Sequence, residues 1–171
     1  HAFSIEMARK PDTCKECHAG PDVPAYKVYT ASKHGNIFSA MNSHWNFQPV
    51  PWTVGKDFQA PTCAVCHVSQ LATERNDLIV MRTHQMNDRL KWRLFGLIYG
   101  HPHPKSPDTT QIRNSAGLPL PTELTGEPVE KFLIGKEEQE FRELTMQQVC
   151  LSCHSTSWVE GHFTRLDHTI R

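Results

Sequence analysis

Six cysteines and three histidines of this chain form one pattern, Cys-x-x-Cys-His, that occurs three times. The cysteine pairs are Cys14 with Cys17, Cys63 with Cys66, and Cys150 with Cys153, and the histidines that follow them are His18, His67 and His154. Each thiol of such a pair can form a thioether with one vinyl group of a haem, and the next imidazole can then bind the iron from one side. The pattern predicts three covalently bound haem c groups, held by these nine residues.

Other uses of paired cysteines account for the pattern less well. A zinc site needs four ligands, usually from two converging pairs, so three pairs would leave one pair without a partner. A thioredoxin-like redox pair does not require a histidine after its second cysteine. A disulfide within such a pair closes a very small loop and constrains the chain little. Since no cysteine lies outside the pattern, haem attachment is the interpretation that uses every cysteine.

Each haem iron has a second axial position, and eight further histidines are available to fill it. A histidine or methionine there gives a haem that passes electrons, whereas an open position allows a substrate to bind. We expect one such ligand in His34, because the neighbouring Gly35 would let a haem face approach the backbone. We expect another in His84, in the middle of a predicted helix, and His162, just after the third motif, is a further candidate.

Proline-rich and glycine-rich segments indicate how much of the chain is irregular. Residues 1–30 are expected to be mostly loop with a turn of helix before Cys14, and residues 31–62 to hold one short helix followed by a long loop. Residues 100–128 are again rich in proline and irregular. No alternating run is long enough to predict a sheet. We therefore predict a mainly α fold with extensive loops, compact around three haems and forming one domain over residues 1–171.

Three segments have the pattern of helices. Residues 71–99 contain no proline, and their apolar residues recur at steps of three or four positions or multiples of these, which predicts helix in two pieces. Residues 129–149 are predicted to form a helix that leads into Cys150, with Glu137, Glu138 and Glu140 facing water and an apolar side made of Phe132, Leu133, Phe141, Leu144 and Val149. Residues 155–171 can form a third helix.

The composition excludes several classes of function. Eighteen lysines and arginines balance eighteen aspartates and glutamates, and no basic run is present, so nucleic-acid binding is not expected. No apolar run approaches the length needed to span a membrane. The chain begins at His1 rather than methionine, which we interpret as the start of a processed, secreted mature protein. Because haem c is attached outside the cytoplasm, the expected location is periplasmic or extracellular.

Several stretches together resemble the C-terminal, haem-bearing part of the octahaem hydroxylamine oxidoreductase family, which is related to pentahaem cytochrome c nitrite reductase. They are CKECHAGPD and YTASKHG, then APTCAVCHVSQ and THQMNDRLKW, then GLPLPTEL, and finally RELTMQQVCLSCHSTSWVEGHFTRLD. The resemblance runs through most of the chain. It implies closely spaced haems in contact, mostly with two histidine ligands each.

The resemblance also implies a crossed set of distal ligands. His34 would serve the third haem, on the motif that ends at His154, and His84 would serve the first, on the motif that ends at His18. The middle haem of the family takes its distal histidine from a region upstream of the part matched here. In this chain His1 or His44 would have to fold back to the middle haem, or a neighbouring copy would have to donate a histidine.

These features favour a trihaem electron-transfer cytochrome over an enzyme, with no catalytic residue assigned. Its partners would be redox proteins or an extracellular electron acceptor, and an intersubunit histidine ligand would allow self-association into a helical, electron-conducting filament. An alternative is an oxidoreductase for hydroxylamine or nitrite with an open middle haem, where Lys56, Arg75 or His44 would be candidate acids or charge stabilisers. A third interpretation is an electron-transfer subunit of a larger multihaem complex.

Overall fold

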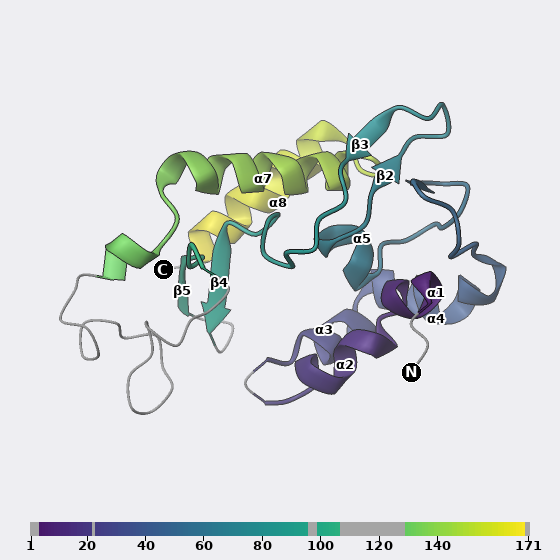
Figure 1. The fold of residues 1–171 in the computed structure, drawn as a ribbon, viewed down its shortest axis with the longest axis horizontal. Coiled ribbons are helices and arrows are strands. Elements are labelled where there is room, and N and C mark those ends of the chain that lie inside the picture. Colours follow the sequence, from purple (N-terminus) through teal and green to yellow (C-terminus); the bar gives the residue numbers. More distant parts are fainter. Residues whose placement is uncertain (1–3, 22, 96–98, 107–128, 170–171) are drawn as a thin grey trace.

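The computed structural model describes residues 4–21, 23–95, 99–106 and 129–169. Helices α7 (Lys136–Leu151) and α8 (Thr156–Thr169) lie side by side along one side of the molecule, and the N-terminal helices lie on the other side (Figure 1). Helix α5 (Cys63–His67) lies between these two groups and contacts both α1 and α7. The fold is mainly α with extensive loops, as the sequence predicts, and two small sheets accompany the helices.

The N-terminal segment contains more helix than the sequence suggested. Helices α1 (Ile5–Arg9), α2 (Asp12–His18) and α3 (Ala25–Ala31) occupy the region that was expected to be mostly loop. Helix α1 is fixed to the rest of the fold by its last residue, Arg9, which is only 4% exposed. The Arg9 guanidinium donates a 2.7 Å hydrogen bond to the carbonyl of Phe47 and lies 4.5 Å from the ring centre of Trp52.

Helix α4 (Lys33–Met41) begins directly after α3, at Ser32. The Ser32 hydroxyl caps α4 by accepting a 3.2 Å hydrogen bond from the Gly35 amide, and it donates to the carbonyl of Tyr29 at the end of α3. A short 3-10 helix, η1 (Asn42–His44), continues α4. This tight junction fixes the direction in which the first turn of α4 presents its side chains.

About half of the hydrophobic core comes from the segment predicted to be a long loop. Its buried residues are Trp45, Phe47, Trp52, Phe58, Ala60, Val65, Leu71, Val80 and Val149. Trp52 is fully buried, and its ring centre lies 4.3 Å from that of Phe58. Apart from the two-residue strand β1 (Trp52–Thr53), the backbone between η1 and α5 is irregular, so aromatic packing rather than a regular element holds it in place.

The prediction of helix over residues 71–99 is wrong where the structure describes this segment, at residues 71–95 and 99. Strand β2 (Leu71–Ala72) pairs parallel with β1 and antiparallel with β3 (Leu78–Val80), and β4 (Trp92–Phe95) pairs antiparallel with β5 (Tyr99–Pro102). A turn closed at Thr73 and Asp77, with Asn76 at φ 67°, separates β2 from β3. Leu78 is 53% and Met81 63% exposed, so the apolar spacing that suggested a buried helix face does not correspond to one.

The two C-terminal helices agree better with the sequence. The 3-10 helix η3 (Val129–Phe132) precedes α7, so the predicted helix over residues 129–149 is real but begins at Lys136, and Glu137, Glu138 and Glu140 are exposed as expected. Its predicted apolar side is only partly buried, because Phe141 is 63% and Leu144 58% exposed. None of the helices that the structure describes is long and apolar enough to cross a membrane. A single domain over residues 1–171 stays a prediction.

Candidate haem sites

All three Cys-x-x-Cys-His motifs lie on helical turns. The first forms the end of α2, the second is the whole of α5, and the third begins in the last turn of α7. After α7 ends, the turn continues because the amides of Cys153 and His154 both donate to the carbonyl of Cys150, at 3.1 and 2.9 Å. Residues three and four positions apart share one face of a helix. The spacing therefore presents both thiols and the imidazole of each motif to the same side, as attachment to one haem requires.

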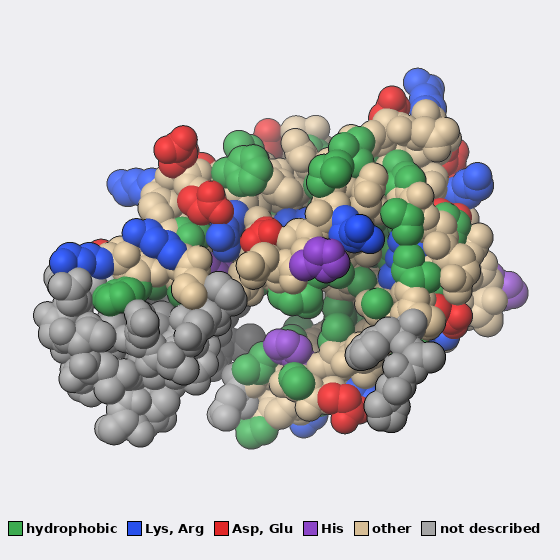
Figure 2. Space-filling view, viewed as in Figure 1, with side chains coloured by type: hydrophobic (Ala, Val, Ile, Leu, Met, Phe, Trp, Pro, Cys, Tyr) green, Lys and Arg blue, Asp and Glu red, His purple; other side chains and the backbone are tan. Residues whose placement is uncertain are grey.

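The second motif lies between the other two. The thiol of Cys63 lies next to that of Cys14 in the first motif, and this contact lowers the pKa of the Cys14 thiol to about 7. On its other side, Cys66 lies within electrostatic range of Cys150 and Cys153, and burial raises its pKa to about 12. Figure 2 shows a hollow near the middle of one face, with histidine side chains on both sides of it. The fold thus brings together motifs that are far apart in the sequence.

The imidazole rings of His34 and His154 lie close together, although the two residues are far apart in the sequence. Their ring centres are 6.1 Å apart and their planes are inclined by 52°. Two imidazoles that bind one metal from opposite sides, with metal–nitrogen bonds of about 2 Å, have ring centres roughly 6 Å apart. Burial lowers the pKa of His34, and the nearby His154 adds to this effect, so the neutral form that binds metals is favoured. This pair is the one that the crossed ligand pattern assigns to the third haem.

A largely apolar cavity of about 400 Å³ adjoins this histidine pair. Its walls include the third motif and residues from α4, α7, α8 and the start of β4, among them His34, Cys150, Cys153, His154, Trp158 and Trp92. Ligand and cofactor sites commonly have volumes of about 300 to 1,000 Å³. The buried indole Nε1 of Trp92 has no hydrogen-bond acceptor among the described residues. Paired thiols, facing imidazoles, apolar walls and an unpaired donor fit a haem c group with its anionic propionates.

The rings of α8 extend this site along the helix. Trp158 stacks on His154 with ring centres 4.0 Å apart, and His162 stacks on the far side of Trp158 at 5.2 Å. His162 is exposed at the cavity wall. The structure therefore brings His162 into the neighbourhood of the third motif, where its ring stacks on Trp158.

The imidazole of His67 in the second motif has a fixed orientation. Its Nδ1 lies 2.9 Å from the carbonyl oxygen of Met86, which can only accept, so Nδ1 carries the proton and Nε2 is left to bind a metal. Burial lowers the pKa of His67, while the bond to Met86 opposes this shift. Such a second bond is the usual way in which a metal-binding histidine is held in place.

The remaining predicted ligands lie in different settings. His84 is exposed in a bend between β3 and β4, not in a helix, and its segment is tied to the second motif by the bonds from Thr83 to Val68 and from His67 to Met86. His44 is exposed in η1. His1 lies outside the described residues. The structure also corrects the reason given for Gly35, since a Cβ there would lie 2.1 Å from the carbonyl oxygen of Tyr29, so Gly35 allows α3 and α4 to pack.

Alternative uses of the cysteines receive no support from this arrangement. None of the six cysteines, all of which are described, forms a disulfide. Nowhere in the described parts of the chain do three or more His, Cys, Asp or Glu side chains converge as metal ligands, as a zinc site would require.

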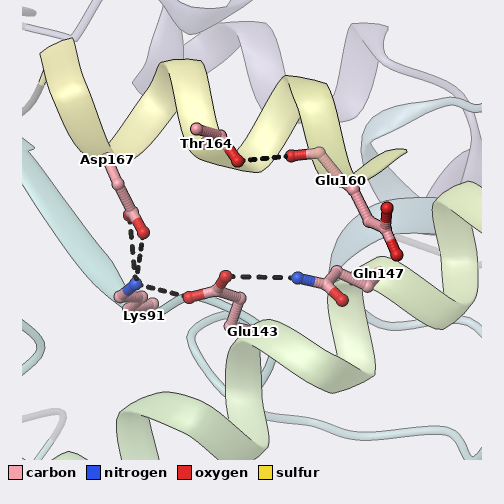
Figure 3. Close-up of polar contacts among 6 residues, drawn as sticks. All are labelled: Lys91, Glu143, Gln147, Glu160, Thr164 and Asp167. Atoms are coloured by element: carbon pink, nitrogen blue, oxygen red, sulfur yellow. Dashed lines mark hydrogen bonds and ion pairs between the residues drawn. The ribbon is translucent and has the colours of Figure 1, made fainter. Parts of the chain in front are cut away.

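Lys91 closes one side of the cavity by joining the two C-terminal helices. Its ammonium group donates to the carboxylates of Glu143 on α7 and of Asp167 on α8, the latter at 3.0 and 3.1 Å (Figure 3). Gln147 donates to the second oxygen of Glu143 at 3.2 Å. Burial alone would lower the pKa of Lys91, but the bonds to Glu143 and Asp167 outweigh it and raise that pKa.

We expect Lys91→Met to destabilise the packing of α7 on α8. Glu143 is only 17% exposed, so loss of its cation leaves a poorly solvated carboxylate near that of Asp167. The expected cost is about 1 to 3 kcal/mol of the free energy of unfolding, measured by denaturant titration of the holoprotein. Lys10→Met is the control, because the Lys10–Glu6 pair is 35% and 43% exposed within one turn of chain and should contribute under about 1 kcal/mol. Equal losses in the two variants would contradict the structural role of Lys91.

Sequence reasoning missed Arg89, Lys91 and Trp92. All three line the cavity, and Arg89 donates to backbone carbonyls of the second motif. The only signal was the clustering of two cations and an indole in the stretch NDRLKW, a combination suited to an anionic group. Interpreting this stretch as part of a helix concealed that signal.

Comparisons with known proteins agree on one family. Residues 1–92 match the family model described as "Seven times multi-haem cytochrome CxxCH". The chain is 30% identical over 176 residues to a protein of Kuenenia stuttgartiensis described as a probable nitrite reductase-hydroxylamine oxidoreductase fusion protein, and the match covers 98% of this chain but 18% of the relative. The chain thus spans about a fifth of the length of this curated relative.

Solved structures show the same similarity. A protein described as a hypothetical multiheme protein is 36% identical, with a TM-score of 0.79, over 98% of this chain and 39% of that one. The Kuenenia stuttgartiensis reducing HAO-like protein complex Kustc0457/Kustc0458 is 26% identical, with a TM-score of 0.65, over 97% of this chain and 30% of the matched one.

Proposed function

Because this chain belongs to the multi-haem cytochrome family with CxxCH motifs, we propose that it is an electron-transfer protein that carries three covalently bound haem c groups. Haem iron supplies the redox chemistry, since it accepts and releases one electron without a change in the covalent structure of the group. The thiols of each motif would fix the position of one haem, and His18, His67 and His154 would be its proximal ligands.

The position of the second motif is the observation that carries this proposal. Cys63 contacts Cys14 of the first motif, and Cys66 lies near Cys150 and Cys153 of the third. Groups attached to these sulfurs would form a row with the middle motif in its centre. The protein's own contribution would be to hold the row rigidly through helix ends and buried contacts, such as the bond from His67 to Met86.

The distal ligands proposed are His34 for the third haem and His84 for the first. The separation of 6.1 Å between the His34 and His154 rings supports the former. The assignment of His84 to the first haem is compatible with two observations. The His84 segment is bonded to the end of the second motif, and His67 of that motif lies within electrostatic range of His18 in the first. For the middle haem, His1 is favoured over His44 since α1, which follows His1 closely, packs on α5. A histidine from a neighbouring copy is the alternative.

Partner proteins are part of this proposal. The solved HAO-like relative is described as a protein complex, and the curated relative is described as a fusion protein, which supports a role beside further redox proteins. Docking as a subunit of such a complex and self-association into a conducting filament are both compatible with a middle haem whose distal ligand comes from another chain. Because haem c is attached outside the cytoplasm, we assign the protein to the periplasm or the cell exterior.

A second candidate function is reduction or oxidation of a small nitrogen compound at an open middle haem. The name of the curated relative, which includes nitrite reductase and hydroxylamine oxidoreductase, favours this alternative. It requires that no histidine reaches the distal side of the group bound to Cys63 and Cys66.

Spectroscopy of the holoprotein distinguishes the two functions. For an electron carrier we expect three low-spin ferric signals in the low-temperature EPR spectrum, unchanged by nitrite, hydroxylamine or cyanide, and three haems per chain by intact mass. A high-spin signal that responds to these ligands would contradict the electron-carrier proposal and support the enzyme. Fewer than three haems would contradict the assignment of all three motifs.

A further inference from the structure

The Arg89 side chain lies at the centre of the molecule, against the second motif. It is only 2% exposed. Its Nη1 donates to the carbonyls of Val65 and Cys66, at 2.9 and 3.4 Å, and its Nη2 donates to those of Ser69 and Met81, both at 2.7 Å. The guanidinium thus binds the carbonyls at the C-terminal end of α5 and joins them to the chain that leaves β3. Favourable contact of a cation with a helix C-terminus is expected from the helix dipole.

The charge of Arg89 is not compensated by an ion pair. No carboxylate in the described part of the chain forms a salt bridge with it, although Asp88 acts on it at longer range. Burial lowers the pKa of Arg89, but a guanidinium stays protonated in proteins. The cavity wall that includes Cys66 therefore carries a fixed positive charge in a poorly solvated place.

The neighbouring cations differ in this respect. Lys91 is neutralised by Glu143 and Asp167, and the buried Arg142 is paired with Glu138 at 2.8 Å. Arg142 also donates to a backbone carbonyl, that of Asn87, at 2.8 Å. Arg142 is thus also buried and also donates to a backbone carbonyl, but it makes fewer such bonds than Arg89 and has a carboxylate partner.

We propose that Arg89 is a positioning residue of the second motif and that its unpaired charge holds the reduction potential of the middle haem above the value that the same site would have without it. This inference rests on the proposed function. The hydrogen bonds of Arg89 set the direction of the Cys63–His67 helix. Through the bond to Met81 they also hold the segment that carries His84 and Met86. Reduction adds one electron to the ferric site and transfers no proton, so a nearby fixed cation favours the reduced form.

The test is a spectroelectrochemical titration of the holoprotein in four forms: the parent chain, Arg89→Gln, Arg89→Lys and Arg142→Gln. Arg89→Gln removes the charge but keeps two amide donors, whereas Arg89→Lys keeps the charge with fewer donors. We expect Arg89→Gln to lower the potential of one couple by at least 59 mV, which is a tenfold change in the equilibrium of a one-electron couple. Arg89→Lys and Arg142→Gln should leave the same couple within half of that shift.

Haem content by intact mass, measured on the same samples, separates the possible failures. Unchanged potentials in Arg89→Gln, with all haems retained, would overturn the role of Arg89 and leave the proposed function intact. Equal shifts in Arg89→Gln and Arg89→Lys would overturn the role of the charge. If Arg89→Gln loses a haem, retention of all haems at unchanged potentials in Arg89→Lys supports the proposal, and loss of a haem there too overturns it. Absence of reversible couples in the parent chain would contradict the proposed function itself.

Discussion

Gly35→Ala is expected to disrupt the junction between α3 and α4 and to displace His34 from the third motif. An alanine Cβ at this position would lie 2.1 Å from the carbonyl oxygen of Tyr29 and 2.8 Å from the Cα of Thr30. Both are backbone atoms, which cannot move aside as a side-chain end can. We expect a loss of about 3 kcal/mol or more in the free energy of unfolding, at the upper end of overpacking costs. One low-spin EPR signal should become high-spin as the axial bond weakens.

Gly20→Ala is the matched control for this prediction. No heavy atom lies within 4 Å of a Cβ built at Gly20. This glycine lies two residues after His18 of the first motif, so it also tests a change close to a haem site. The control should keep the unfolding midpoint and the EPR spectrum of the parent. A Gly35→Ala protein with parental stability and spectrum would show that α3 and α4 do not pack as described.

Replacing both Cys63 and Cys66 with alanine is expected to remove the middle haem and to interrupt electron exchange between the outer two. The second motif lies between the other two, since its Cys63 contacts the first motif and its Cys66 approaches the third. We expect the intact mass to show one haem fewer. Electron exchange between the remaining haems, followed after rapid partial reduction, should become much slower.

The comparison for this variant is the double change of Cys14 and Cys17 to alanine. It also leaves two motifs, but these two are neighbours, so their electron exchange should stay fast. If both double variants exchange electrons equally fast, the row with the second motif in its centre is wrong. Loss of more than one haem in the Cys63 and Cys66 variant would indicate that this motif also supports the folding of the others.

The chemistry of the site was more predictable from the sequence than the fold around it. Thioether attachment requires fixed residue types at fixed spacing, so the motifs are visible without any structure. The close approach of His34 and His154 was anticipated only through the family resemblance, since nothing local connects residues so far apart. The function of Gly35 was misjudged because its near neighbour, the Tyr29 carbonyl, belongs to the preceding helix.

Irregular segments account for most of the errors in the fold. Tertiary contacts decide their structure: the stretch around Trp52 has turn residues throughout, yet its aromatic side chains form the core. Residues 71–99 have helical spacing of apolar side chains, but Arg89 and short strand pairs hold residues 71–95 in extended and turn conformations. Residue patterns describe local preferences. A two-residue strand is too short to show a periodic pattern, and hydrogen bonds from a guanidinium to backbone carbonyls far along the chain leave no pattern at all.

The facing pair of His34 and His154 also bears on the unfolded chain. The two residues are far apart in the sequence, and ligation of one iron by both would close a loop of well over half the chain. A covalent cross-link that closes a loop of about 100 residues lowers the entropy of the unfolded state by the equivalent of roughly 4 to 5 kcal/mol. Axial ligation of one iron by both histidines would therefore stabilise the folded chain by restricting the unfolded one, and it would couple binding of the third haem to the placement of α4.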